Sequence, residues 1–482
     1  MTTDAAASAP NPASEPDTEV WFSSNPVLSD RSFFGHPSGL ATLAFTEGFI
    51  AFSYYGMQSL LMLYMLGALL TPAHIGHVFG LSVFRQGLSF LYGPLAGQPL
   101  AAAIMGVYAA TVYATPILGG LLADRWLGRS RTIVLGSVLM TLGHFLMAFD
   151  ASFLIALFCL VVGTGCAGGL KAQVGGFYAH NDNRRSDAFQ IYVLSVQLAV
   201  IVAPLICGTL GEKVDWRLGF GTAGLGMLIG LVIYLAGLKR LPPEPVRPAT
   251  SDRTARQKLS STEVKTLAVL TLIIPVMAVA AVGNMEIFNG YLVWGAHAYQ
   301  LVFFGQVMPV SWLLSMDAFI STFTLTASVV FWRWRAKRGK DPNEITKVAL
   351  GAAISAVGPL ILALASLQLA NGGKVGLVWG LAFHLINNLG FANMYGVGMA
   401  LFSRAAPKQL GATVVNAFSL HLFLANLLVG GLAGRLNRMS NVQFWLLHAG
   451  LIAAAAVVLA IMARLFRNLL APSPADAAPD FR

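Results

Sequence analysis

The strongest constraint on this chain is a series of twelve apolar segments, each long enough to cross a membrane as a helix. They lie near residues 38–66, 100–122, 132–149, 153–178, 188–210, 218–238, 264–294, 307–332, 346–370, 375–402, 411–433 and 441–463. A helix satisfies its own backbone hydrogen bonds where water is absent, so these segments predict helices. Of the 482 residues, 56% are hydrophobic and 11% are charged, whereas roughly a quarter are charged in soluble domains. We therefore expect an all-α, multi-pass membrane protein and exclude a soluble enzyme.

The distribution of basic residues predicts the orientation. With Met1 in the cytoplasm, 24 of the 31 Lys and Arg fall on the inner side, Lys171 lies within a span, and six fall outside (Arg85, Lys213, Arg217, Lys374, Arg435 and Arg438). Cytoplasmic loops are enriched in Lys and Arg, so both termini are predicted to be cytoplasmic. The net charge of +10 is then mainly a topology signal. No basic face interleaved with polar and aromatic residues is present, so we expect the lipid bilayer and not nucleic acid as a partner.

Polar stretches divide the chain into two halves. The first residues are rich in Ala, Pro, Ser and acids and lack the pattern of a signal peptide, which predicts a disordered cytoplasmic tail. The only long internal polar stretch separates six spans from six and is expected to be a cytoplasmic linker. The expected divisions are the tail 1–37, an N-terminal six-helix bundle 38–241 with an extracellular cap segment 71–99, the linker 242–263, a C-terminal six-helix bundle 264–466 and a cytoplasmic tail 467–482.

A glycine-rich loop follows the second span. It runs from Gly119 to Arg129 (GGLLADRWLGR) and contains an Asp-Arg pair between glycines. This loop resembles the loop between helices 2 and 3 of the major facilitator superfamily, whose two six-helix halves also match the plan of this chain. The resemblance implies a gating role for Asp124, Arg125 and Arg129, which would pair with helix ends in a contact that breaks when the halves move. A loop that only orients the chain is the alternative.

Further motifs resemble one family within that superfamily, the proton-dependent oligopeptide transporter (POT) family. The resemblance covers about residues 33–465. The motifs are Phe52–Met57 (FSYYGM), Gly163–Gly165 (GTG) followed by Lys171, Ala203–Gly208 (APLICG), Trp216–Gly221 (WRLGFG) and Pro309–Trp312 (PVSW). The resemblance implies a major facilitator fold, alternating access and proton-coupled uptake of small peptides across a bacterial inner membrane. It implies a monomer without a cofactor.

The chain departs from this family at several charged positions. The family's Glu-x-x-Glu-Arg run keeps only Glu47, because Ile50 and Ala51 replace its second acid and its arginine. The acid that receives a peptide's amino terminus in helix 10 falls at Phe391. In helix 8 an asparagine becomes Asp317. The helix 7 glutamate corresponds to Met285 or Glu286, with the register left open, and family asparagines in helices 4 and 5 give way to Gln173 and Gln197.

Four acids or bases remain within the spans: Glu47, Lys171, Glu286 and Asp317. A charge at the bilayer centre costs about 3 kcal/mol or more, so such groups usually face a cavity or each other. Lys171 is the best candidate to attract a substrate carboxylate, in competition with Glu47. The three acids are candidates for proton coupling in the order Glu47, Glu286, Asp317. For each residue, an ion pair that only joins helices is the alternative.

Uncharged residues complete the predicted substrate site. The resemblance or their place in a span selects Tyr54, Tyr55, Gln173, Gln197, Asn289, Trp312, Phe391, Asn393 and Phe418. Asn284, Asn416 and His421 are further candidates, and a structural interhelical hydrogen bond is the alternative for each. His144, His384 and His448 have no partner that spacing identifies, and no convergent ligands indicate a metal site.

Three hypotheses remain from the sequence. The first is proton-driven uptake of a small peptide or peptide-like compound by alternating access. The second is transport of a non-peptide organic anion or modified amino compound by a divergent member, without proton coupling. The third is a membrane sensor or scaffold that no longer transports. No catalytic constellation supports an enzyme, and the chain has no Walker lysine motif for ATP.

Overall fold

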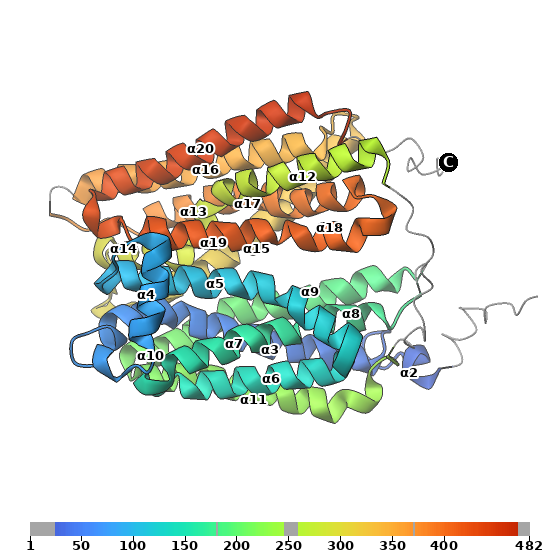
Figure 1. The fold of residues 1–482 in the computed structure, drawn as a ribbon, viewed down its shortest axis with the longest axis horizontal. Coiled ribbons are helices and arrows are strands. Elements are labelled where there is room, and N and C mark those ends of the chain that lie inside the picture. The colour runs from blue at the N-terminus through green and yellow to red at the C-terminus, as the bar shows by residue number, and fades with distance from the viewer. Residues whose placement is uncertain (1–24, 180–181, 245–258, 370–371, 471–482) are drawn as a thin grey trace, which may run out of the picture.

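The computed structural model describes residues 25–179, 182–244, 259–369 and 372–470. Its helices form two bundles, one above the other in Figure 1. The N-terminal bundle comprises α3 (Ser38–Tyr64) with η1 (Met65–Leu69), α5 (Gly97–Leu122), η3 (Ala123–Leu127), α6 (Arg129–Leu146), η4 (Asp150–Ser152), α7 (Phe153–Ala167), α8 (Leu170–Gly175), α9 (Arg184–Ala203), η5 (Pro204–Gly208), α10 (Thr209–Lys213), α11 (Trp216–Gly237) and η6 (Leu238–Arg240). The C-terminal bundle comprises α12 (Ser261–Ala280), α13 (Val282–Met285), η7 (Glu286–Phe288), α14 (Gly290–Ala298), β1 (Val302–Phe303), β2 (Gln306–Val307), α15 (Trp312–Lys337), α16 (Glu344–Leu369), α17 (Val378–Ala405), η8 (Lys408–Leu410), α18 (Gly411–Phe418), α19 (Leu420–Ala433), η9 (Leu436–Arg438) and α20 (Asn441–Leu465).

The predicted all-α membrane fold is confirmed. Ten helical segments among the described residues are long and apolar enough to cross a membrane. The two other predicted spans are α6 and α17, which are long helices with more polar side chains. Four passes among the described residues are divided into successive helices: α7 is followed by α8, α9 by η5 and α10, α12 by α13 and α14, and α18 by α19. Broken helices inside a membrane protein are tolerated where they are buried or line a cavity, so these breaks indicate places where function is concentrated.

The tail predicted for residues 1–37 is wrong in its last part, because residues 25–37 are structured. Pro26–Ser29 form the short helix α2, and the Asp30 carboxylate accepts a hydrogen bond of 2.8 Å from the backbone N–H of Ser38, the first residue of α3. Hydrogen bonds from Ser38 hold the pKa of Asp30 well below its usual range. The rest of that tail lies outside the described residues, as do most of the linker 242–263 and of the tail 467–482.

The segment 71–99 crosses the outer ends of the helices, if the orientation follows the charge distribution. It contains η2 (Ile75–His77) and the amphipathic helix α4 (Leu81–Tyr92), which stands across the bundle in Figure 1. The Tyr92 hydroxyl donates a hydrogen bond of 2.9 Å to the carbonyl of Leu427 in the other bundle. The position fits the proposed extracellular cap, and it also connects the two halves at that end.

The two bundles touch closely near the same end. A Cβ atom added at Gly106 in α5 would lie 2.5 Å from the Cα of Gly430 in α19, so the two backbones meet where no side chain fits. Gln98 in α5 also donates a hydrogen bond of 2.7 Å to the carbonyl of Ala433 in α19. Small residues allow such close helix crossings in membranes. This crossing holds the outer ends of the bundles together.

Glu212 forms the second outer contact. Its carboxylate, in α10 of the N-terminal bundle, accepts hydrogen bonds of 2.7 Å and 2.8 Å from the backbone N–H groups of Val310 and Ser311, just before α15 of the C-terminal bundle. Unpaired N–H groups at a helix start favour an anion. The hydrogen bonds between described residues of the two bundles lie in this outer part or near the middle, so the polar contacts that join the bundles are concentrated there.

We predict that Glu212→Ala weakens the outer closure. Loss of a helix-capping carboxylate costs about 1 kcal/mol, which changes the ratio of open to closed outer ends by roughly fivefold. Spin labels at exposed outer positions 85 and 374, one in each half, would report the change as a longer distance in pulsed electron paramagnetic resonance.

The matched control is Glu344→Ala. Glu344 forms an ion pair with Arg404, and both residues belong to the C-terminal bundle. Its removal should leave the distance between the outer labels unchanged. An equal distance distribution in the Glu212→Ala and Glu344→Ala proteins would contradict the proposed closing contact.

Candidate functional site

Lys171 and Glu47 come together in the N-terminal bundle. Gly168 and Gly169 separate α7 from α8, and Lys171 is the second residue of α8 after this break. Its side chain is exposed, whereas Glu47 in α3 is half-buried. Glu47 interacts electrostatically with Lys171 and hydrogen-bonds the Tyr192 hydroxyl of α9. The acid and the base that the sequence selected therefore interact electrostatically without forming a direct ion pair among the described residues.

Tyrosine hydroxyls connect this group to the other bundle. The rings of Tyr54 and Tyr55 in α3 meet edge to face at 5.0 Å. Tyr55 interacts electrostatically with Tyr395 of α17, Glu47 and Asp317 of α15. The predicted residues Tyr55, Glu47 and Asp317 therefore lie around the same part of the interface between the bundles, although they come from distant segments.

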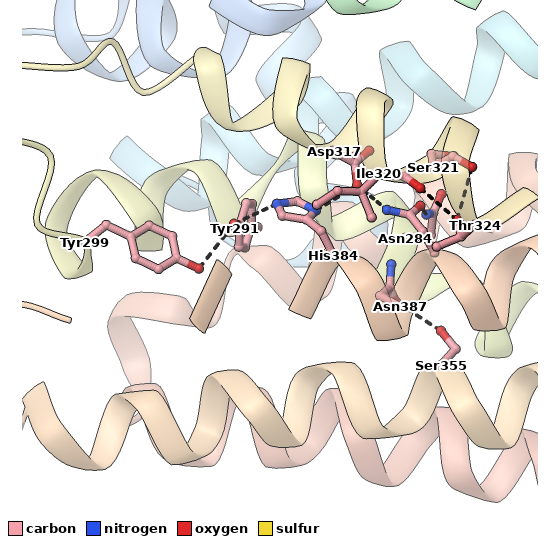
Figure 2. A network of polar contacts seen from close by, with 11 residues as sticks. Asn284, Tyr291, Tyr299, Asp317, Ile320, Ser321, Thr324, Ser355, His384 and Asn387 are labelled. Atoms are coloured by element: carbon pink, nitrogen blue, oxygen red, sulfur yellow. Dashed lines mark hydrogen bonds and ion pairs between the residues drawn. The ribbon is translucent and has the colours of Figure 1, made fainter. Parts of the chain in front are cut away.

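Asp317 is held within the C-terminal bundle and not by Lys171. One carboxylate oxygen accepts a hydrogen bond of 2.6 Å from the Asn388 side chain, and His384 Nδ1 lies 2.7 Å from the same oxygen (Figure 2). His384 and Asn388 are one turn apart in α17, so both point at α15. Sequence reasoning missed His384, and the one available signal was an ionisable residue within a span.

A continuous polar network extends from Asp317 in both directions. On one side, His384 Nε2 lies 2.8 Å from the Tyr291 hydroxyl, which lies 3.2 Å from the Tyr299 hydroxyl. On the other side, Asn284 donates a hydrogen bond of 3.3 Å to Asn388. Figure 2 shows these residues arranged in a row along the bundle. Buried polar groups in a membrane require partners, and this row supplies them.

Glu286 lies at the break in the seventh pass, next to Met285. It is completely buried, and its carboxylate accepts a hydrogen bond of 3.0 Å from the backbone N–H of Gly290 at the start of α14. His448 Nε2 lies 3.3 Å from its other oxygen. A Cβ at Gly290 would lie 2.2 Å from the Glu286 carboxylate, so a larger residue here would displace that carboxylate from its hydrogen bond. Met285 instead contacts the Asn426 amide through its sulfur. Glu286 therefore caps the broken helix and pairs with a histidine that spacing did not identify.

Aromatic residues of the prediction divide into two groups. Phe391 stacks on Tyr395 with 5.6 Å between ring centres and is half-buried. Phe418 is buried, with its ring 5.6 Å from Tyr395, so both residues lie near the tyrosines of the interface. Trp312 lies elsewhere, because its indole N–H donates a hydrogen bond of 2.8 Å to Thr209 in the outer contact between the bundles. The structure thus gives Trp312 a contact between the bundles, and its assignment to a pocket wall stays a prediction.

Four predicted polar residues form hydrogen bonds with other residues of the protein, as the structural alternative for each of them expects. Gln173 bonds Ser130 and Tyr234, Asn393 bonds Ser328, Trp332 and the Leu389 carbonyl, Asn289 donates to the Ala102 carbonyl at 3.1 Å, and Gln197 donates to Thr322 at 2.7 Å. The partners of Gln173 and of Asn393 lie within the same bundle as the residue itself, and a role of either in substrate binding stays a prediction. Asn289 and Gln197 each form a hydrogen bond between the two bundles, and these hydrogen bonds would break if the bundles moved apart.

The glycine-rich loop forms η3 and the start of α6. Asp124 and Arg125 are exposed, and no ion pair of Asp124, Arg125 or Arg129 is present among the described residues. Glu244 accepts a hydrogen bond of 2.9 Å from the backbone N–H of Ser130, so another acid occupies this helix start. A gating contact of Asp124 stays a prediction, and it would have to form when the cytoplasmic ends close.

A cavity of about 620 Å³ lies at the outer end and not at the group formed by Lys171, Glu47 and Asp317. Its lining includes Gln98, Trp294, His297, Ala298 and Lys374. None of the predicted substrate residues lines it. Among the described residues, no group of three His, Cys, Asp or Glu side chains could hold a metal ion.

The chain is similar to known transporters along most of its length. Residues 49–430 match the Major Facilitator Superfamily. A di-/tripeptide transporter of Lactococcus lactis is 27% identical over 450 residues, covering 79% of this chain and 85% of that protein. A peptide transporter of Yersinia enterocolitica is 26% identical, covering 84% of this chain and 89% of that protein. A crystal structure of a mutant of peptide transporter POT with sulfate has a TM-score of 0.80 at 25% identity, covering 94% of this chain and 99% of that one.

We predict that Lys171→Ala removes the binding of carboxylate ligands. A hydrogen bond to a charged group contributes about 1.5–3 kcal/mol, which corresponds to a loss of affinity of roughly tenfold to more than a hundredfold. Ligand-induced shifts in melting temperature across dipeptides, amino-acid conjugates and organic acids would measure the loss.

Lys239→Ala is the matched control, because Lys239 is an exposed base at the end of α11 away from this group. Lys171→Arg, which keeps the charge, should retain binding. Unchanged affinity in the Lys171→Ala protein would remove Lys171 from the substrate site.

Proposed function

The chain belongs to the Major Facilitator Superfamily and is a secondary-active membrane transporter, and we propose that it uses a proton gradient to take up small peptides or peptide-like compounds. The resemblance to the POT family is confirmed by the peptide transporters among its relatives and structural neighbours. Those relatives transport solutes and none is named as an enzyme. The fold supports alternating access, with the two bundles rocking about a site near the middle of the membrane.

One observation carries the proposal for substrate recognition: Lys171 is an exposed base inside a broken span, with Glu47 as its neighbouring acid. A substrate carboxylate would compete with Glu47 for the ammonium group. Binding would thereby free Glu47 from its counterion, and a freed buried carboxylate takes up a proton more readily. This competition would couple substrate binding to proton binding. A carboxylate held by Lys171 alone would lack the two-point contact of an arginine, so affinity should be modest.

The C-terminal bundle's side of the interface between the bundles favours a second candidate substrate class. Where the family has an acid for the peptide's amino terminus, Phe391 stacks on Tyr395. Asp317, the acid of that bundle that interacts with Tyr55, is already occupied by His384 and Asn388. A ligand without a free amino terminus, such as an organic anion or a modified amino compound with an apolar end, would suit this surface better than an ordinary dipeptide.

The remaining expectations form part of the same proposal. The bacterial relatives support a location in a bacterial inner membrane, and the fold supports a monomer that works without a partner chain. The third hypothesis, a sensor or scaffold that does not transport, requires bundles that do not move. Glu212 and the paired Gln197 and Thr322 are polar contacts that can break and re-form, which favours transport.

Uptake into proteoliposomes tests the proposal directly. With the outside made more acidic than the lumen, we expect accumulation of a labelled dipeptide that collapses when a protonophore removes the gradient. Unlabelled organic acids and amino-acid conjugates should be offered as competitors in the same assay. If neither dipeptides nor tripeptides enter or compete, the peptide assignment is wrong and the organic-anion alternative takes its place. Absence of any uptake would support the sensor hypothesis.

We predict that Glu47→Gln flattens the pH dependence of uptake. The amide imitates a permanently protonated acid, so uptake should no longer increase as the outside pH falls. Initial rates measured over a series of outside pH values, with the lumen held constant, would show this. Glu263→Gln is the control, because Glu263 is an exposed capping acid at the start of α12. A profile identical to that of the unmodified protein would move the proton role from Glu47 to the other acids.

A further inference from the structure

A row of four ionisable side chains runs through the C-terminal bundle. The Tyr299 and Tyr291 hydroxyls are 3.2 Å apart, Tyr291 is 2.8 Å from His384 Nε2, and His384 Nδ1 is 2.7 Å from Asp317 (Figure 2). Tyr291 lies at the start of α14, Tyr299 directly follows its end, and His384 and Asp317 belong to α17 and α15. Every gap in the row is therefore short enough for a hydrogen bond.

The hydrogen bonds in this row have one consistent direction. An ionised carboxylate only accepts, so the Asp317 side chain assigns the proton of neutral His384 to Nδ1. Nε2 then accepts from the Tyr291 hydroxyl. The Tyr291 oxygen in turn accepts from the Tyr299 hydroxyl. A row of donors that all point the same way is the arrangement through which a proton can be relayed.

The two ends of the row lie near different parts of the molecule. Tyr299 is 1% exposed and does not line the outer cavity of about 620 Å³, but the residue before it, Ala298, does. The Trp294 ring also lines this cavity and meets the Tyr299 ring at 5.1 Å. At the other end, the Asp317 side chain is 13% exposed and interacts with Tyr55 of the opposite bundle. The row thus runs from beside the outer cavity to the interface between the bundles.

The bundle contains a second acid–histidine pair, Glu286 and His448, which has no onward route for a proton among the described residues. His448 and Glu286 both have completely buried side chains, and they lie 3.3 Å apart. The remaining nitrogen of His448 lies 2.8 Å from the carbonyl of Phe444 in its own helix. A backbone carbonyl cannot pass on a proton, so no proton relay continues beyond His448. The free nitrogen of His384 meets a hydroxyl instead, and a second hydroxyl follows.

We propose that Asp317 and His384 form a second proton-binding site of this transporter, in addition to Glu47, and that Tyr291 and Tyr299 carry protons to it from the side of the outer cavity. The proposal rests on the proton coupling proposed above. A proton arriving at the Tyr299 oxygen displaces that hydroxyl's own proton to Tyr291, whose proton moves to His384 Nε2. The Nδ1 proton then passes to Asp317. One proton enters at Tyr299, one neutralises Asp317, and the three relay groups stay neutral.

No other charge in the described surroundings competes for Asp317. The ionisable groups that interact with it are His384 from α17, Tyr291 from α14 and Tyr55 from α3. The neighbouring helices α9 and α16 present the uncharged side chains Gln197 and Ser355 towards this region of α15 and α17. Neutralising Asp317 weakens its hydrogen bonds to His384 and Asn388. It also removes the charge that faces Tyr55, so proton binding acts directly on the interface between the bundles.

Infrared difference spectroscopy of the substrate-free protein in phospholipid tests the site. Spectra taken between about pH 8 and about pH 5 report protonated carboxyl groups through their carbonyl stretch. Asp317→Asn should remove one component of this band. His384→Gln should keep the component and shift its midpoint. Asp317→Glu retains a carboxyl and should restore a band with a changed midpoint, which distinguishes a lost proton site from a misfolded protein.

The rate at which the band appears tests the route. After a pH jump on the outer side, Tyr299→Phe and Tyr291→Phe should slow proton binding roughly tenfold or more, because a relay group is missing. The control is Tyr108→Phe, since the buried Tyr108 hydroxyl has no hydrogen-bond partner among the described residues. The position of the band at equilibrium should stay the same in all three variants.

The outcomes separate the proposals. An unchanged band in the Asp317→Asn protein overturns the proton site, and equal rates for Tyr299→Phe and Tyr108→Phe overturn the route. A titrating Asp317 band in a protein that takes up no labelled dipeptide supports the proton site and refutes the peptide substrate. Dipeptide uptake driven by pH in the Asp317→Asn protein supports the proposed function and overturns Asp317 as a second coupling group.

Discussion

A charge inside a membrane needs a partner or water, since burying it alone costs about 3 kcal/mol or more, and the helices of this protein are arranged around that requirement. Lys171 is exposed beside Glu47, where α7 gives way to α8. Glu286 caps α14 at the break in the seventh pass. Asp317 lies against α17, whose side chains bond it. Each acid or base therefore lies at a helix break or at a contact between helices.

The outer contacts determine which of these charges water can reach. The glycine crossing of α5 and α19 brings two backbones together, and the capping carboxylate of Glu212 joins the bundles beside it. These contacts hold the outer ends together, while Lys171 is exposed within its broken span. The outer cavity is lined by Ala298 and Trp294, which are neighbours of the buried Tyr299.

The two bundles carry different sets of ionisable side chains. The N-terminal bundle carries an exposed base and an acid of opposite charge, which suits recognition of a carboxylate. The C-terminal bundle carries acids that are paired with histidines, which suits exchange of protons. Tyr55 interacts with the acids of both bundles and lies between them. Coupled transport requires that binding in one bundle changes the other bundle. Tyr55 lies between the carboxylate-binding candidates of the N-terminal bundle and the acid–histidine pairs of the C-terminal bundle.

The sequence by itself determined the spans, the orientation and the family, because apolar length, loop charge and local motifs are all contained in short stretches of chain. It also identified Glu47, Lys171, Glu286 and Asp317 as functional candidates from the cost of a membrane charge. Only the tertiary structure decided their partners. His384 and His448 are far from Asp317 and Glu286 in sequence, and Gln173 could turn either to the interface or to Ser130. Helix packing fixes those choices, and no local pattern encodes it.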